Sequence, residues 1–348
     1  MDMYGLIEYM LQKGASDLHI GIEKPPMVRI DGELTPVTGE AVLQKDTAHN
    51  LIYSLLTDDQ KARFEEKREL DLSLDYRGNR VRINLFRQKD SDGAALRKIL
   101  QSVPDFNTLG IPPIVEKYAV GSTPGLVLVT GSTGSGKTTS LASMIDYINT
   151  NRSEHIVTVE DPIEFLHRSN MSIVHQRGIG SDTVSFAEAL KYVLRQDPNV
   201  VLIGEMRDKE TIRATLNIAE TGHLVFSTLH TSDAVQTINR VVDVFPQEEQ
   251  RQVRVQLSFV LKAVFSQQLL PRIGGGMVLA CEILVNTDAV QNMIRQESHQ
   301  IYSAMQTGRQ FGMQTMNQAL KELYYKKLID RQVALYYSSM PDELRMII

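Results

Sequence analysis

The most informative segment of this chain reads Gly131-Ser132-Thr133-Gly134-Ser135-Gly136-Lys137-Thr138. The apolar run 125–130 precedes it, and residues 139–148 after it have the spacing of an amphipathic helix. A strand, a glycine-rich turn and a helix in this order are typical of a phosphate-binding P-loop. Glycines let the backbone N–H groups surround an anion, and the helix N-terminus adds partial positive charge. The segment therefore predicts a site for ATP or GTP.

Individual residues of this loop have separate expected roles. Lys137 is long enough to reach the β- and γ-phosphates, and the hydroxyl of Thr138 can ligate Mg²⁺. The residues predicted to contact the nucleotide are Ser132, Thr133, Gly134, Ser135, Gly136, Lys137, Thr138 and Thr139.

Composition limits the class of protein. The 348 residues are 42% hydrophobic and 23% charged, which is ordinary for a globular protein with room for two domains. A net charge of −5 argues against nucleic acid as the main partner. The single cysteine, Cys281, excludes an intrachain disulfide and a cysteine-based zinc site. We find no signal-peptide pattern and no apolar run near the roughly 20 residues that span a bilayer, so we expect a cytoplasmic protein.

The chain divides into three regions. Residues 1–101 have the pattern of a small α+β domain, with a capping box at Thr57 to Gln60. Predicted elements are a helix at 6–13, a turn at Asp31-Gly32, and strands at 17–21, 26–30, 70–76 and 80–86. Prolines punctuate residues 102–124, which we interpret as a linker. Residues 125–348 alternate strands and helices, as an α/β domain does, and are mostly helical after Pro246 apart from a strand around Cys281.

Acidic residues follow two further strands of the predicted parallel sheet, whose carboxyl ends are where ligands bind. Glu160 and Glu164 follow the strand at 156–159, and Glu205 follows the strand at 200–203. Glu205 has the position of a Walker B acid, which holds Mg²⁺ through water or orients the attacking water, although Gly204 replaces the usual preceding Asp. Which of the three glutamates activates water is left open by the sequence.

Two histidines bracket the predicted strand at 224–228. His223 and His230 are seven residues apart, so they point to opposite faces of a strand and cannot both ligate one metal. We predict that each contacts the nucleotide or a neighbouring subunit.

Together these motifs resemble those of the secretion ATPase superfamily and, within it, of the type IV pilus retraction motors. The Walker A motif corresponds to 131–138, the acidic box to 158–164, the atypical Walker B motif to 201–208 and the histidine box to 221–230. Further similarity lies at 14–19, 80–84 and 240–246.

The resemblance implies an architecture and a chemistry. It implies a RecA-like P-loop ATPase domain, a smaller PAS-like N-terminal domain at 1–101 and a C-terminal helical bundle at about 287–348. The subunits would form a homohexamer that hydrolyses ATP with Mg²⁺, held by Thr138 directly and by Glu205 through water. Arg82 and Arg97 match the positions of arginines that reach the γ-phosphate.

The implied function is a motor ATPase for type IV pilus retraction, that is, for pilin disassembly and twitching motility. Its expected partners are an inner-membrane pilus platform protein and a paralogous retraction ATPase, and its expected place is the cytoplasmic side of the inner membrane, bound peripherally. A tetracysteine metal site, usual in pilus extension and type II secretion ATPases, is impossible with one cysteine.

Several alternatives remain at this point. In the C-terminal retraction signature, residues 289–297, Gln291 stands in place of an arginine, which leaves an accessory or paralogous pilus or type II secretion motor possible. A RecA-like nucleic-acid translocase predicts stimulation by DNA or RNA, and the acidic balance argues against it. A small-molecule kinase predicts an acceptor and a monomer or dimer. A non-enzymatic ATP-binding scaffold predicts no phosphate release.

Overall fold

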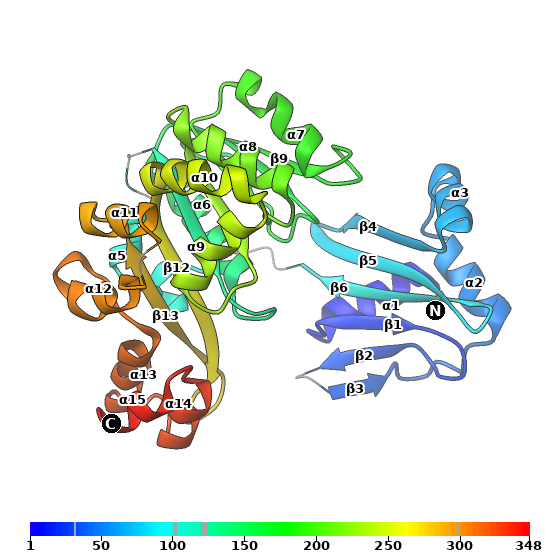
Figure 1. The fold of residues 1–348 in the computed structure, drawn as a ribbon. Coiled ribbons are helices and arrows are strands. Elements are labelled where there is room, and N and C mark those ends of the chain that lie inside the picture. The colour runs from blue at the N-terminus through cyan, green and yellow to red at the C-terminus, as the bar shows by residue number, and fades with distance from the viewer. Residues whose placement is uncertain (31–32, 100–102, 120, 122–123, 298) are drawn as a thin grey trace. The chain divides into compact units, whose positions relative to one another are not determined.

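The computed structural model describes residues 1–30, 33–99, 103–119, 121, 124–297 and 299–348. The chain divides into two compact units, Met1–Ser102 and Val103–Ile348, each with its own hydrophobic core (Figure 1). The turn predicted at Asp31-Gly32 lies outside the described residues.

The N-terminal unit is an antiparallel sheet with three helices. The strand order is β3-β2-β1-β6-β5-β4. The strands are β1 (Asp17–Ile20), β2 (Met27–Ile30), β3 (Glu33–Pro36), β4 (Glu69–Tyr76), β5 (Asn79–Gln88) and β6 (Ser91–Lys98). The helices are α1 (Met3–Gln12), α2 (Lys45–Tyr53) and α3 (Asp58–Lys67), and α3 begins with the predicted capping box. All three helices share one core with the buried face of β5, which presents Val81, Ile83 and Leu85. The opposite face of β5 therefore carries Arg82, as the period of two predicts.

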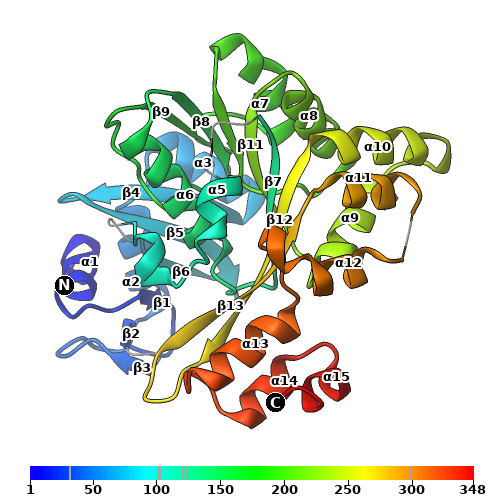
Figure 2. The same ribbon diagram turned by 90° about the vertical axis from the view of Figure 1, so that its left-hand side faces the viewer.

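The C-terminal unit contains a seven-stranded sheet in the order β13-β12-β7-β11-β10-β8-β9 (Figure 2). Its strands are β7 (Gly125–Thr130), β8 (His155–Glu160), β9 (Ile173–Gly178), β10 (Val200–Ile203), β11 (Leu224–Leu229), β12 (Leu261–Pro271) and β13 (Met277–Val285). All neighbouring pairs are parallel except β12 with β13. The P-loop strand β7 lies inside the sheet beside β11, and all its residues are buried.

Helices connect the strands and pack on the sheet. They are α6 (Lys137–Asn151), α7 (Phe186–Val193), η1 (Leu194–Gln196), α8 (Lys209–Glu220), α9 (Ala234–Asp243) and α10 (Gln247–Val260). Their apolar residues join those of the strands in one core. Among the described residues, none of the helices has both the length and the apolar character needed to cross a bilayer.

The segment predicted as a linker, 102–124, carries structure of its own. It contains α4 (Phe106–Leu109) and α5 (Ile114–Ala119), and its described part belongs to the C-terminal unit. Ile111 and Val115 are buried in that unit's core, and the ring of Phe106 stacks on that of Tyr147 at a centroid distance of 5.2 Å. The prolines suggested a linker without structure of its own. The segment is instead held in the C-terminal unit by the apolar residues between the prolines, such as Phe106 against α6.

The chain after β13 is helical, as predicted. The elements are α11 (Asp288–Arg295), α12 (Ile301–Thr307), η2 (Gly308–Phe311), α13 (Met316–Tyr325), α14 (Arg331–Tyr337) and α15 (Pro341–Arg345). Helices α13 to α15 lie together beside the β12–β13 hairpin and share a small core with it (Figure 2). The prediction of mostly helix directly after Pro246 was wrong for residues 261–271, which form β12.

Candidate nucleotide-binding and catalytic site

The P-loop joins β7 to α6 at the carboxyl end of the parallel sheet. Gly131, Gly134 and Gly136 all have positive φ angles, of 144°, 79° and 89°. A Cβ atom on Gly131 would stand 2.4 Å from the carbonyl oxygen of Gln267 and 2.4 Å from Oγ of Ser135. The turn therefore requires glycine at 131 for space as well as for backbone conformation.

The start of α6 has the features of an anion site. Gly136 is its N-cap residue and supplies no side chain to the first-turn N–H groups of this 15-residue helix. Oγ of Ser135 is buried and has no hydrogen-bond partner among the described residues. A phosphate would supply acceptor oxygens for this buried hydroxyl and for the uncapped N–H groups beside it. Thr138 and Thr139 lie in the same first turn and are half-buried.

We expect the substitution Gly131→Ala to weaken nucleotide binding. The added Cβ overlaps a backbone oxygen, so the loop must move. We expect binding at least about tenfold weaker, because a loss of about 1.4 kcal/mol of binding free energy is enough for that change. Titration with a fluorescent ATP analogue measures the loss. Gly274→Ala is the matched control, since its φ is also positive, no atom lies within 4 Å of the added Cβ, and the residue lies between β12 and β13, outside the P-loop. Equal affinities for the two variants would contradict the steric argument.

Lys137 lies folded along the P-loop. Its ammonium donates to the carbonyl oxygens of Gly131 and Ser132, both at 2.8 Å, and the residue is 8% exposed. Burial lowers the pKa of Lys137, and the charges of Glu205 and Glu164 act in the opposite direction. The same charges show that the P-loop and the ends of β8 and β10 form one cluster.

Glu205 is the centre of that cluster. Its side chain is 12% exposed, and its two carboxylate oxygens pair with the guanidinium of Arg207 and, at 3.6 Å, with Nε2 of His230. The ion pair raises the pKa of Arg207. Arg207 lies within the Walker B segment, 201–208, but the sequence assigns it no role, because nothing in a linear sequence shows that its side chain turns back on Glu205. Asp208 has a structural role, since it caps the N-terminus of α8.

The other two glutamates differ in environment. Glu160, the last residue of β8, is 8% exposed, and it accepts hydrogen bonds from Thr158 Oγ1 at 2.7 Å and Gln176 Nε2 at 3.2 Å. Those bonds hold its carboxylate within the sheet. Glu164 is half-buried in the loop after β8 and acts electrostatically on Lys137. Glu164 and Glu205 both act electrostatically on the ammonium of Lys137.

His223 is not part of this cluster. It precedes β11, and its carbonyl oxygen accepts from the N–H of Gly125 at the beginning of β7. The P-loop follows the other end of β7, about 20 Å of strand away. The predicted contact of His223 with the nucleotide is thus not supported within one chain, and a contact with another subunit stays a prediction. Its Nδ1 lies 3.1 Å from the carbonyl oxygen of Ile218.

Arg82 and Arg97 lie directly opposite each other in the N-terminal unit, on β5 and β6. Nε of Arg97 donates to Oδ1 of Asp17 at 2.7 Å, and Asp17 is 6% exposed. Arg82 has a looser ion pair with Asp71 at 3.8 Å. Burial raises the pKa of Asp17, but the hydrogen bonds from Arg97 and Ser16 and nearby positive charge lower it further, for a net decrease. The sheet thus presents two arginines side by side on its polar face.

Comparison with known proteins gives consistent results. A family described as type II/IV secretion system protein matches residues 3–282. The chain is 47% identical over 345 residues to the type IV pilus retraction ATPase PilT of Pseudomonas aeruginosa, covering 98% of this chain and 99% of that protein. It is 38% identical to the type IV pilus ATPase PilU of the same organism, over 100% of this chain and 91% of that one.

Solved structures agree. A crystal structure of the pilus retraction motor PilT with bound ADP superposes with a TM-score of 0.93 at 46% identity, covering 99% of both chains. The Legionella pneumophila ATPase DotB gives a TM-score of 0.79 at 27% identity, covering 94% of this chain and 93% of that one. The chain belongs to the type II/IV secretion system protein family. The α/β ATPase fold, the use of a nucleotide and the resemblance to pilus retraction ATPases, all predicted from the sequence, are confirmed.

Proposed function

We propose that this chain is one subunit of a homohexameric ring that hydrolyses ATP to retract type IV pili, by withdrawing pilin subunits through an inner-membrane platform protein. The observation that carries the proposal is the cluster of Lys137, Glu205 and His230 at the carboxyl end of the parallel sheet. The protein would act at the cytoplasmic face of the inner membrane, in some cells beside a paralogous retraction ATPase.

The residues of the cluster divide the reaction between them. The P-loop N–H groups and Lys137 would bind the β- and γ-phosphates, and residues 132–139 would enclose them. Glu205 would orient the attacking water and accept its proton, while His230 and Arg207 hold its carboxylate in place. Glu164 would assist from the loop after β8. Glu160 would support that loop, because its own oxygen is committed to Thr158 and Gln176.

The donor set at this site suits magnesium. A hydroxyl from Thr138 and a carboxylate from Glu205, the latter through water, are hard oxygen ligands of the kind that Mg²⁺ prefers beside nucleotide phosphates. When bound, Mg²⁺ would neutralise charge on the phosphate oxygens.

The positive charge needed at the γ-phosphate would come from the N-terminal unit. Arg82 and Arg97 form a pair on its polar face, and arginines used in this way stabilise the charge of a phosphoryl group in transfer. In such a motor the PAS-like unit, residues 1–101, would be the part that closes over the nucleotide.

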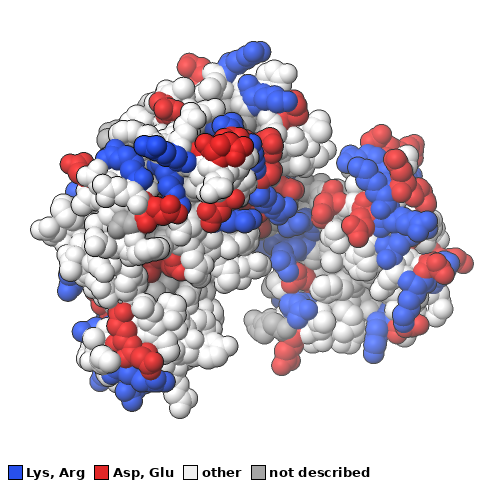
Figure 3. Space-filling view, in the orientation of Figure 1, with Lys and Arg blue, Asp and Glu red and all other residues white. Residues whose placement is uncertain are grey.

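A nucleic-acid translocase receives no support from the charge distribution. On the face shown in Figure 3, acidic and basic side chains lie intermingled on each unit taken by itself. Nucleic-acid-binding proteins instead gather basic residues in a patch or stripe. The charge distribution does not bear on the accessory-motor alternative, because an accessory motor would hydrolyse ATP in the same way and differ only in its cellular role.

Three measurements test the proposal. We expect the purified protein to release phosphate from ATP with Mg²⁺ and to have the native mass of a hexamer; a stable monomer or dimer would contradict the ring. We also expect the gene to restore twitching to Pseudomonas aeruginosa cells that lack PilT. Rescue only of cells that lack PilU would instead identify an accessory motor, and DNA-stimulated turnover would favour a translocase.

A further inference from the structure

Glu282 on β13 is a buried carboxylate that holds the N-termini of two helices. The residue is 3% exposed. Its Oε1 accepts a hydrogen bond from the N–H of Ala234 at 2.8 Å, and its Oε2 accepts one from the N–H of Met316 at 3.2 Å. These are the first residues of α9 and α13. First-turn N–H groups have no partner within their own helix, so this one side chain joins two helices that are distant in sequence.

The α9 end of this link leads to the candidate catalytic site. The loop before α9 begins at His230, whose Nε2 lies 3.6 Å from Glu205. Thr231 and Thr237 have their Oγ1 atoms 2.7 Å apart, and Thr237 also donates to the carbonyl oxygen of Asp233. The loop is thereby fixed to the first turns of α9, so a shift of α9 would move His230.

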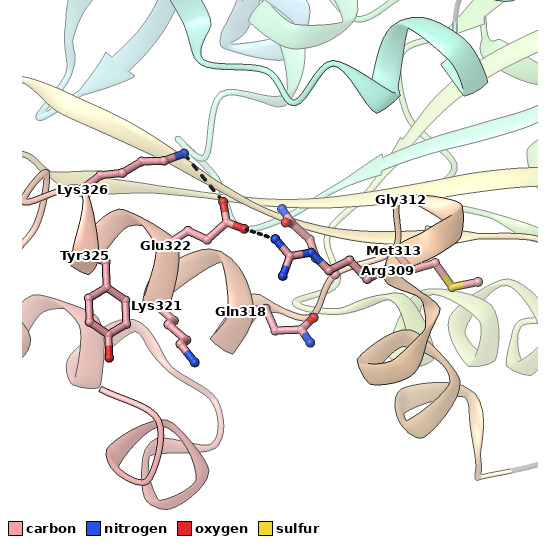
Figure 4. A pocket seen from close by; sticks show the side chains of 9 residues that line it. Arg309, Gly312, Met313, Gln318, Lys321, Glu322, Tyr325 and Lys326 are labelled. Atoms are coloured by element: carbon pink, nitrogen blue, oxygen red, sulfur yellow. Dashed lines mark ion pairs between the residues drawn. The ribbon is translucent and has the colours of Figure 1, made fainter.

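The α13 end leads to the surface. Residue 314, just before α13, pairs with Ile283 through two backbone hydrogen bonds of 2.8 and 3.1 Å. The outer side of α13 lines a hollow of about 590 Å³, where Glu322 lies between Arg309 and Lys326, 3.7 and 3.6 Å from their nitrogens (Figure 4). The beginning of helix α13 is thus held by Glu282, while Glu322, Tyr325 and Lys326 on its outer side are exposed.

We propose that Glu282 is a positioning residue that couples α13 to the Glu205–His230 pair, so that a displacement of the C-terminal helices changes the rate of ATP hydrolysis. The inference rests on the proposed role of Glu205. It adds a route by which load on the C-terminal helices would reach the reacting water.

Proton uptake by Glu282 should weaken the link. Burial raises the pKa of Glu282 to about 7; the hydrogen bond from Ala234 opposes this, and the charge of Asp233 adds to it. Two further titratable groups lie near Glu282. One is the thiol of Cys281, whose pKa is raised by burial and by the charge of Glu282. The other is Tyr302 of α12, whose pKa burial raises to about 12 and whose hydroxyl donates to Glu343 of α15. A protonated carboxyl carries no charge and one of its oxygens bears a hydrogen, so it accepts from the two helix N–H groups more weakly than the carboxylate does. The link is therefore intact above about pH 7 and weakened below it.

The substitution Glu282→Gln tests the coupling. Glutamine keeps the size but faces one helix N–H with an amide NH₂, so one of the two bonds is lost. We expect kcat to fall about 10- to 100-fold, since small misplacements of a catalytic group have this effect, with the KM for ATP unchanged. We also expect wild-type kcat to decline below about pH 7, where Glu282 takes up a proton, and we expect this decline to be absent in the variant.

Asp330→Ala is the matched control. Asp330 caps α14 by accepting from the N–H of Val333 at 2.7 Å, so its loss weakens the start of a C-terminal helix but leaves both hydrogen bonds of Glu282 in place. We expect a lower melting temperature but wild-type kcat and pH dependence. An equal loss of kcat in both variants, or wild-type kcat in Glu282→Gln, would refute the coupling.

Amide hydrogen exchange on the wild-type protein decides the matter if Glu282→Gln does not fold. After correction for intrinsic rates, exchange at Ala234 and Met316 should rise together as the pH falls through about 7. Independent behaviour of the two amides would overturn the inference. Turnover by a Glu205→Gln variant would instead overturn the role of Glu205, and thus separates a failure of the proposed function from a failure of the coupling.

Discussion

Replacing Glu205 with glutamine should leave ATP bound but not hydrolysed. The amide keeps the shape of the carboxylate but cannot accept a proton from water, and removal of a general base costs about 10²- to 10⁴-fold in rate. Phosphate release gives kcat, and titration with a fluorescent ATP analogue gives the affinity. Binding should persist, because the P-loop and Lys137 supply the phosphate contacts and Lys137 bonds to the loop itself.

The fold of this variant should be preserved. The ion pair lost with Glu205 involves an Arg207 side chain that is 69% exposed, and such pairs contribute about 0–1 kcal/mol. Glu210→Gln is the charge-matched control, since Glu210 is exposed in the first turn of the neighbouring helix α8. Wild-type turnover in Glu205→Gln, with a large loss in Glu164→Gln, would move the role of base to Glu164.

Local pattern predicted those parts of the site that depend on neighbours in sequence. The glycines of the P-loop have positive φ angles, which the glycine-rich motif itself indicates. Period-two alternation predicted Arg82 on the polar face of β5. The carboxyl ends of parallel strands meet at one edge of the sheet, so the sequence alone predicts that Glu164 and Glu205 lie near Lys137.

What the sequence did not predict depends on contacts between distant residues. Strand β12 is mostly buried, but its apolar residues are interrupted by Lys262, Ser266, Gln267 and Gln268, so it lacks the alternation that identifies a half-buried strand. Strand β6 contains Ser91, Asp92 and Gly93, which have low strand propensity, and it exists because β5 pairs with it along its length. Glu282 looked like one polar residue in an apolar strand, and only the tertiary structure shows that two helices begin against it.

Removing Arg82 should cost more activity than any other single change outside the C-terminal unit. Arginines that neutralise a transferring phosphoryl group contribute about 10³–10⁵ in rate. If Arg82 is such an arginine, we expect Arg82→Ala to lower kcat by a factor in that range. Its stability should change little, because its ion pair with Asp71 spans 3.8 Å and both side chains are accessible. Phosphate release and thermal unfolding, measured together, test both statements.

Arg97→Ala should combine two effects. Arg97 contacts the buried carboxylate of Asp17, so its removal should also destabilise the N-terminal unit, by about 0.5–1.5 kcal/mol, because Asp17 keeps its hydrogen bond from Ser16. Arg77→Ala is the control, since Arg77 pairs with Glu8 at the surface, and it should retain wild-type turnover. Turnover of Arg82→Ala within about twofold of wild type would exclude Arg82 from the reaction.

The double variant then shows whether the two arginines act on one charge. Arg82 and Arg97 are direct cross-strand partners, so their guanidinium groups can converge on the same phosphate oxygens. Residues that serve one group give losses that do not multiply, and we expect the double variant to lose less activity than the product of the single losses. Losses that multiply would instead mean that the two arginines stabilise separate groups. The pairing of Arg82 with Arg97 across β5 and β6 would then serve the structure of the sheet and not the reaction.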